Sequence, residues 1–110
     1  MKQYVIDEIR PEDFKKIKAY LDENFGPSTM QGIYWILVHE DILTDIQTEH
    51  SDCRPFYFAV DLEENLMACE LLVRTKSRVK CNCISYATEK QRNWFIGFID
   101  DIFEKIGIIS

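Results

Sequence analysis

The segment from Phe56 to Val73 constrains the fold more than any other, because apolar residues occupy every second position on both sides of a turn. That spacing is the period of a β-strand with one buried face. A turn at Glu64-Asn65 places four apolar pairs opposite one another: Leu62 with Met67, Val60 with Cys69, Phe58 with Leu71 and Phe56 with Val73. Since every cross-strand pair is apolar, all four pairs favour the same antiparallel register.

A second hairpin extends this pattern. With Lys76-Ser77-Arg78 at its tip, it sets Val73 opposite Cys81 and Leu71 opposite Cys83. The sequence thus predicts a three-stranded antiparallel meander of residues 56–62, 66–74 and 79–86. In this register Cys69, Cys81 and Cys83 lie on the apolar face.

Two amphipathic helices are expected on that sheet. Pro11 suits a first helical position, apolar residues recur at helical spacing after it, and Gly26-Pro27 ends the run, which predicts a helix over 11–25. Thr88 and Gln91 form a capping box before a broad apolar stripe that ends at Gly107, which predicts a helix over 89–106. An N-terminal strand is expected within residues 3–9.

Residues 28–50 allow two interpretations. The apolar run from Ile33 to Val38 is rich in β-forming residues and favours a buried strand, but one long helix over 29–49 competes, because periodicity does not separate the two. A short helix starting near His39 would turn Ile42, Leu43 and Ile46 inward. The whole chain, 1–110, is predicted to be one α+β domain with helices packed on a sheet.

Charge, hydropathy and the absence of known motifs argue against several classes of function. The net charge of −6 opposes binding to phosphate backbones, so no nucleic-acid partner is expected. No apolar run approaches the ~18 residues that a membrane span needs. An acid, Asp7, stands where a signal peptide would be apolar, so a cytoplasmic location is expected. The sequence contains no phosphate-binding loop, GxGxxG, HExxH, GxSxG or EF-hand pattern, which disfavours an enzyme.

The four cysteines leave three interpretations open. In a cytosolic chain they would stay reduced, and they could simply fill the core, in which case no cofactor is expected. Alternatively, Cys81 and Cys83 could chelate one soft metal ion such as zinc, completed by His50 and Cys53. The third possibility is a redox pair among the same thiols.

A basic hairpin departs from the acidic composition. Its four basic residues lie within seven positions: Arg74, Lys76, Arg78 and Lys80. The cluster could contact an anion or an acidic protein surface, or it could protect a strand edge from aggregation. Glu70, on the same predicted strand, would need Arg54 or Arg74 as a partner if its face is covered.

Aromatic residues off the apolar face, Trp94 and Tyr57 among them, indicate a second contact surface. The leading hypothesis is therefore a non-catalytic protein-binding or adaptor domain that associates with itself as a homodimer or with another protein. The alternative is a metal- or redox-linked domain built on Cys53, Cys81, Cys83 and His50.

Overall fold

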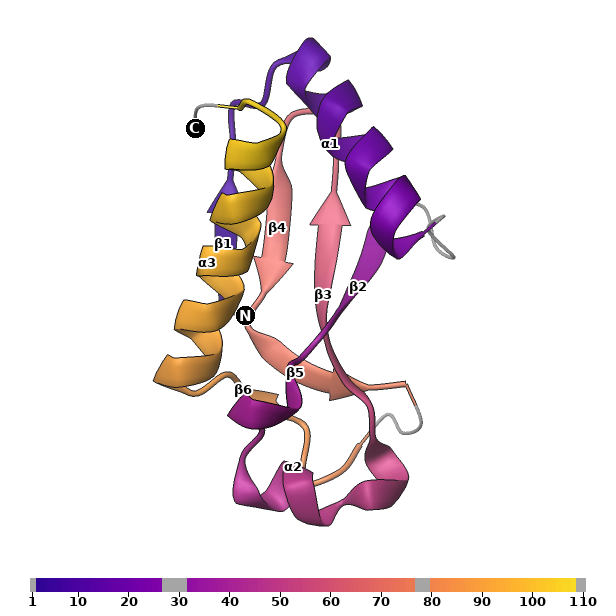
Figure 1. The fold of residues 1–110 in the computed structure, drawn as a ribbon, viewed down its shortest axis with the longest axis vertical. Coiled ribbons are helices and arrows are strands. Elements are labelled where there is room, and N and C mark those ends of the chain that lie inside the picture. The colour runs from indigo at the N-terminus through magenta and orange to yellow at the C-terminus, as the bar shows by residue number, and fades with distance from the viewer. Residues whose placement is uncertain (1, 27–31, 77–79, 109–110) are drawn as a thin grey trace.

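The computed structural model describes residues 2–26, 32–76 and 80–108. In this part of the chain an open antiparallel sheet of six strands is combined with three α-helices, so the predicted α+β class is confirmed (Figure 1). The elements are β1 (Gln3–Ile6), α1 (Pro11–Phe25), β2 (Ile33–Leu37), α2 (Asp45–Glu49), β3 (Phe56–Leu62), β4 (Met67–Glu70), β5 (Leu72–Thr75), β6 (Ser85–Tyr86) and α3 (Glu89–Lys105). Two short 3₁₀ helices, η1 (Glu40–Ile42) and η2 (Ser51–Cys53), flank α2.

Strand β3 is central to the sheet, whereas the predicted meander placed residues 66–74 in the middle. Phe56, Phe58, Val60 and Leu62 are all buried, and the residues between them are half-buried. β2 pairs along one edge of β3, while β4 and β5 pair with different stretches of the other edge. β1 then adds to β4, and β6 adds to β5.

The predicted register of the first hairpin is correct only near its turn. Leu62 pairs with Met67 and Val60 with Cys69, but Phe56 pairs with Thr75 instead of Val73. The pairing of Phe58 with Leu71 is also wrong. Leu71 leaves the ladder because its N–H donates to the carbonyl of Lys2 and its carbonyl accepts from Ala87. The returning chain therefore splits into β4 and β5, and β5 is displaced by two residues.

The third predicted strand, 79–86, is wrong over most of the length that the structure describes. Only Ser85 and Tyr86 form a strand, paired with Val73 and Leu72. Before them, residues 80–84 turn back on themselves, and the N–H of Ile84 donates to the carbonyl of Cys81. Cys81 and Cys83 thus lie in a turn, and neither pairs with Val73 or Leu71.

Both long helices cover the same face of the sheet. On this face Phe58 stacks against Phe95 of α3, with ring centroids 4.1 Å apart. Tyr34, the cross-strand partner of Val60, donates its hydroxyl to Asp22 of α1. The predicted boundaries of α1, residues 11–25, are confirmed, as Pro11 and Gly26 indicated. Helix α3 ends one residue earlier than expected, at Lys105, and Gly107 shortly after it adopts a φ of +77°.

Residues 33–37 of the middle segment form strand β2, so the alternative of one long helix over 29–49 is wrong. Beyond β2 the expected short helix divides into η1 and α2, and its predicted inward face is partly wrong. Ile46 is 48% exposed, whereas the neighbouring Gln47 is completely buried. The reason is that α2 directs an amide rather than an alkyl group into the interior.

Within the described residues, no helix combines the length and the apolar character needed to cross a membrane.

Candidate metal centre

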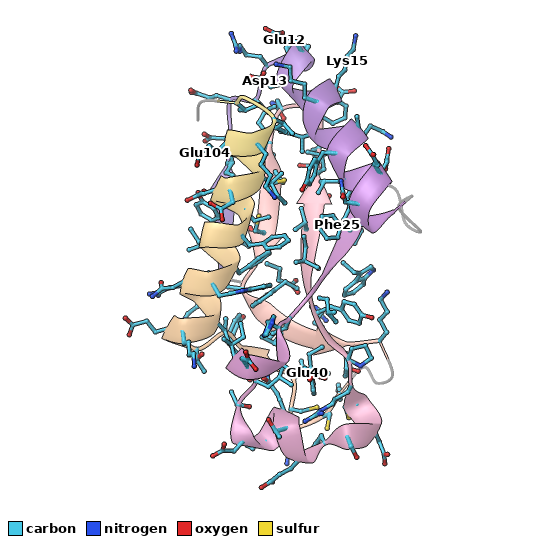
Figure 2. All side chains as sticks on the ribbon, in the orientation of Figure 1. Glu12, Asp13, Lys15, Phe25, Glu40 and Glu104 are labelled. Atoms are coloured by element: carbon cyan, nitrogen blue, oxygen red, sulfur yellow. The ribbon has the colours of Figure 1, made fainter. Side chains whose placement is uncertain are left out.

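Four potential metal ligands come together beside α2. The ligand atoms of His50, Cys53, Cys81 and Cys83 all lie within 4.8 Å of one another. The His50 Nδ1 atom is 3.1 Å from the Cys81 sulfur, and the Cys53 and Cys81 sulfurs are 3.8 Å apart. In Figure 2 sulfur atoms are visible in the lower part of the molecule, next to α2. The structure therefore brings together every residue of the predicted ligand set.

One half of the cluster comes from the end of α2. This helix begins after the capping box residue Thr44, ends at Glu49 and is followed by His50 as its C-cap. The carbonyl of His50 then accepts a hydrogen bond from the N–H of Cys53, which closes the single turn of η2. That turn places the His50 ring and the Cys53 thiol three residues apart on one side of the chain.

The other half comes from the turn before β6. This segment is a turn and not the predicted strand, and the backbone N–H of Ile84 closes it by donating to the carbonyl of Cys81. An extended strand would hold the two α-carbons roughly 6.5 Å apart. The shortening of the third strand is thus what makes the arrangement compact. Cys69, which was expected beside these thiols, lies on β4 in the apolar core and is absent from the cluster.

Buried amides fix this cluster to the rest of the fold. The Gln47 side chain donates to the carbonyl of Cys83 at 3.1 Å, and its oxygen accepts from Gln91 at 2.9 Å. Gln91 donates in addition to the carbonyl of Ile42 at 2.9 Å. From β5, the hydroxyl of Thr75 donates to the carbonyl of Cys53. The backbone on both sides of the cluster is therefore positioned by side chains from α2, α3 and β5.

Sequence reasoning missed the role of Gln47, although a signal was present. Thr44-x-x-Gln47 repeats the spacing of Thr88-x-x-Gln91, which was identified as a capping box. Both boxes form, and both glutamines also reach beyond their own helix to bond each other. That second role depends on the approach of α2 to α3, which no local pattern encodes.

Two distances in the cluster can be compared with those of a tetrahedral zinc site. Zinc binds thiolate sulfur at about 2.3 Å, so two sulfurs of a regular tetrahedron lie about 3.8 Å apart. Cys53 and Cys81 already have this separation. A histidine nitrogen and a sulfur on one zinc would lie about 3.5 Å apart, slightly farther than the observed 3.1 Å. A small outward movement of the His50 ring would bring this pair to the separation of a zinc site.

The thiols differ in acidity. The pKa of Cys81 is lowered to about 6, first because the Cys83 backbone N–H donates to its sulfur and then because the Cys83 thiol and the His50 ring also stabilise the thiolate. Burial, together with the neighbouring sulfurs, raises the pKa of Cys83 to about 12. Cys81 is therefore the more acidic of these two thiols.

A cavity connects the cluster to solvent. A cavity of about 300 Å³ is lined by His50, Cys53 and Cys81 together with Glu49, Ser51 and Asp52. Cys81 is half-buried, whereas Cys53 and Cys83 are only 3% and 1% exposed. An ion entering through this cavity meets Cys81 first.

The basic hairpin is not assembled into one site by the described residues. Arg74 forms a bidentate ion pair with Glu70, at 2.5 and 3.3 Å, which is one of the two partners considered for this carboxylate. Lys76 lies over the rings of Tyr57 and Trp35, with its nitrogen 4.4 and 5.6 Å from their centroids. Lys80 is exposed, and Arg78 lies outside the described residues.

The two aromatic residues predicted to make contacts lie on opposite faces of the sheet. Trp94 of α3 stacks on Phe58 and Phe98, so it belongs to the helix-covered face. Tyr57 points to the other face, where its ring meets Trp35 edge-on at 6.2 Å. They cannot form a single patch.

No protein-family model, curated protein or solved structure matches this chain.

Proposed function

We propose that this chain is a metal-binding domain that holds one zinc ion through His50, Cys53, Cys81 and Cys83. The observation that supports it is the convergence of four soft ligands from two segments that are far apart in the sequence. Two of the sulfurs already have the separation of a zinc tetrahedron. Buried thiols that only filled a core would need no imidazole among them.

The donor set favours zinc over other ions. Three thiolates and one imidazole in a tetrahedral arrangement are typical of structural zinc sites, whereas calcium and magnesium select oxygen ligands. All four positions would be filled by the protein, which leaves none open for a substrate. The ion would tie η2 to the turn before β6, and through Gln47 it would support the start of α3.

Elemental analysis of untagged protein purified without chelator tests this proposal. We expect one zinc per chain, with thiols that react only after chelation or unfolding. Cys83→Ser should lose the ion, whereas the matched change Cys69→Ala, in a buried cysteine outside the cluster, should retain it. Metal-free protein that also fails to bind added zinc at pH 7.5 would leave the cysteines as core residues.

A second proposal, association with another protein, is supported by the uncovered face of the sheet. Since both long helices lie on one face, Trp35, Tyr57 and Leu37 occupy the other, and Leu37 is 55% exposed. We infer a homodimer through this face, in the cytoplasm, where thiols stay reduced. Light scattering should show concentration-dependent dimers that Leu37→Lys weakens. Ile46→Lys, at a similarly exposed apolar position on α2, should not weaken them; a monomer at high concentration would contradict the proposal.

A further inference from the structure

One thiol of the cluster is partly exposed to solvent, while the other two are buried. Cys81 is half-buried and lines the open cavity, whereas Cys53 and Cys83 are almost completely buried. Any small oxidant that reaches the cluster therefore meets the Cys81 sulfur before it meets either of the other two.

Cys53 lies within reach of an oxidised Cys81. Their sulfurs are 3.8 Å apart, and a disulfide bond requires about 2.05 Å. Both residues lie in short turns, outside the ladder of the sheet, so their side chains can approach without breaking strand pairs. Cys83 is a poorer partner, because it is two residues from Cys81 and its carbonyl is held by Gln47.

We propose that Cys81 and Cys53 form an oxidation-responsive pair that a hydroperoxide converts into a disulfide, releasing the bound metal. In the first step the Cys81 thiolate attacks the peroxide, and the O–O bond breaks to give a sulfenic acid and hydroxide, or an alkoxide from an organic hydroperoxide. In the second step the Cys53 sulfur attacks the Cys81 sulfur. The S–O bond breaks, the Cys53 proton leaves with the hydroxyl group as water, and the peroxide has been reduced by two electrons.

This disulfide removes two of the four ligands at once. His50 and Cys83 alone cannot hold zinc in a closed tetrahedral site. The new covalent bond still joins η2 to the turn before β6, so the local fold is retained while the ion leaves. The metal release rests on the zinc site proposed above, whereas formation of the disulfide does not.

The test treats metal-free protein and zinc-loaded protein separately with one equivalent of hydrogen peroxide. Free thiols are then blocked, and the disulfide is located by mass spectrometry of peptides; released zinc is measured with a chromogenic chelator. Trypsin leaves Cys81 and Cys83 in one peptide, 81–90, and Cys53 and Cys69 in another, 19–74, because it does not cleave before Pro55. The variants Cys83→Ser and Cys69→Ala therefore identify which cysteine of each peptide is bonded. We expect a Cys53–Cys81 disulfide in the wild type and in Cys83→Ser, and one zinc released per disulfide formed.

The Cys53→Ser variant provides the complementary control, since its Cys81 should stop at the sulfenic acid and be trapped by dimedone. A disulfide that involves Cys83 or joins two chains, or thiols that survive peroxide in metal-free protein, would overturn the proposal. If the chain takes up no zinc but forms the Cys53–Cys81 bond, the zinc proposal fails and the oxidation-responsive pair stands.

Discussion

Two regions of this molecule are held together by different chemistry. In the apolar layer, between the sheet and helices α1 and α3, the interior consists of stacked rings and alkyl groups such as Phe58, Phe95 and Ile17. In the thiol end, made of α2, η2 and residues 80–84, the buried groups include Gln47 and two cysteines. Figure 1 places α2 at the opposite end of the molecule from α1.

The difference shows how two kinds of burial specify structure. Apolar contacts are non-directional and tolerate rearrangement. The stability of the apolar layer therefore depends on the total volume of its side chains and on the pattern of apolar residues in the sequence. A buried amide network is satisfied in one arrangement only, and each missing partner leaves another polar group unsatisfied. The thiol end therefore has a defined geometry, but the loss of one partner lowers its stability strongly. A bound metal ion would add to that stability.

The largest expected effect lies in the apolar layer. Phe58 is fully buried against Phe95, so Phe58→Ala should lower the free energy of unfolding by about 3–5 kcal/mol, measured by urea denaturation. Tyr57→Ala, the adjacent residue on the uncovered face, should cost clearly less. Equal losses at the two positions would mean that the layer is not the main source of stability.

Alkaline pH should weaken the contact between α1 and β2. Burial, and then the hydrogen bond to Asp22, raises the pKa of Tyr34 to about 12 from its ordinary value of 10. Because the neutral phenol is favoured in the folded state, its contribution is complete below pH 10 and is lost as the pH rises towards 12. The shift of this pKa corresponds to about 2–3 kcal/mol in the free energy of unfolding.

Unfolding free energies measured from pH 9 to 12 should show this decline, and Tyr34→Phe should make it smaller; the part that remains belongs to Tyr4, whose pKa is also raised to about 12. A phenol that titrates near 10 in the folded protein would refute this assignment.

The buried amide network should show a smaller and more local effect. Gln47→Ala leaves the carbonyl of Cys83 and the amide of Gln91 each without one partner, which we expect to cost about 1–3 kcal/mol. Hydrogen exchange should accelerate in α2 more than in α1, and zinc affinity should fall about 10–100-fold. Thr48→Ala, at the exposed neighbouring position, is the matched control.

Zinc affinity should also depend on pH. Since burial and the adjacent sulfurs raise the pKa of Cys83 to about 12, this thiol must release a proton when the ion binds. The affinity should therefore fall at least about tenfold, or about 1.4 kcal/mol, for each unit that the pH is lowered from 8 to 6.5. Competition with a chelator of known pH dependence measures this slope, and a flat profile would exclude Cys83 as a ligand.

Much of the fold could be predicted from local patterns. The alternation in β3, the proline and capping box that begin the two long helices, and the glycine that ends α3 each act within a few residues. The ligand set His50, Cys53, Cys81 and Cys83 could likewise be named, because those residue types are chemically distinctive. These features need no knowledge of distant parts of the chain.

Only the tertiary structure decided how the thiols are arranged. Leu71 leaves the ladder because its backbone bonds to Lys2 and Ala87, and the third strand then shrinks to two residues. This converts the segment carrying Cys81 and Cys83 from a strand into a turn, and it separates them from Cys69. Periodicity in a sequence records which residues prefer burial, whereas the choice of hydrogen-bond partner depends on which distant backbone groups reach the same place.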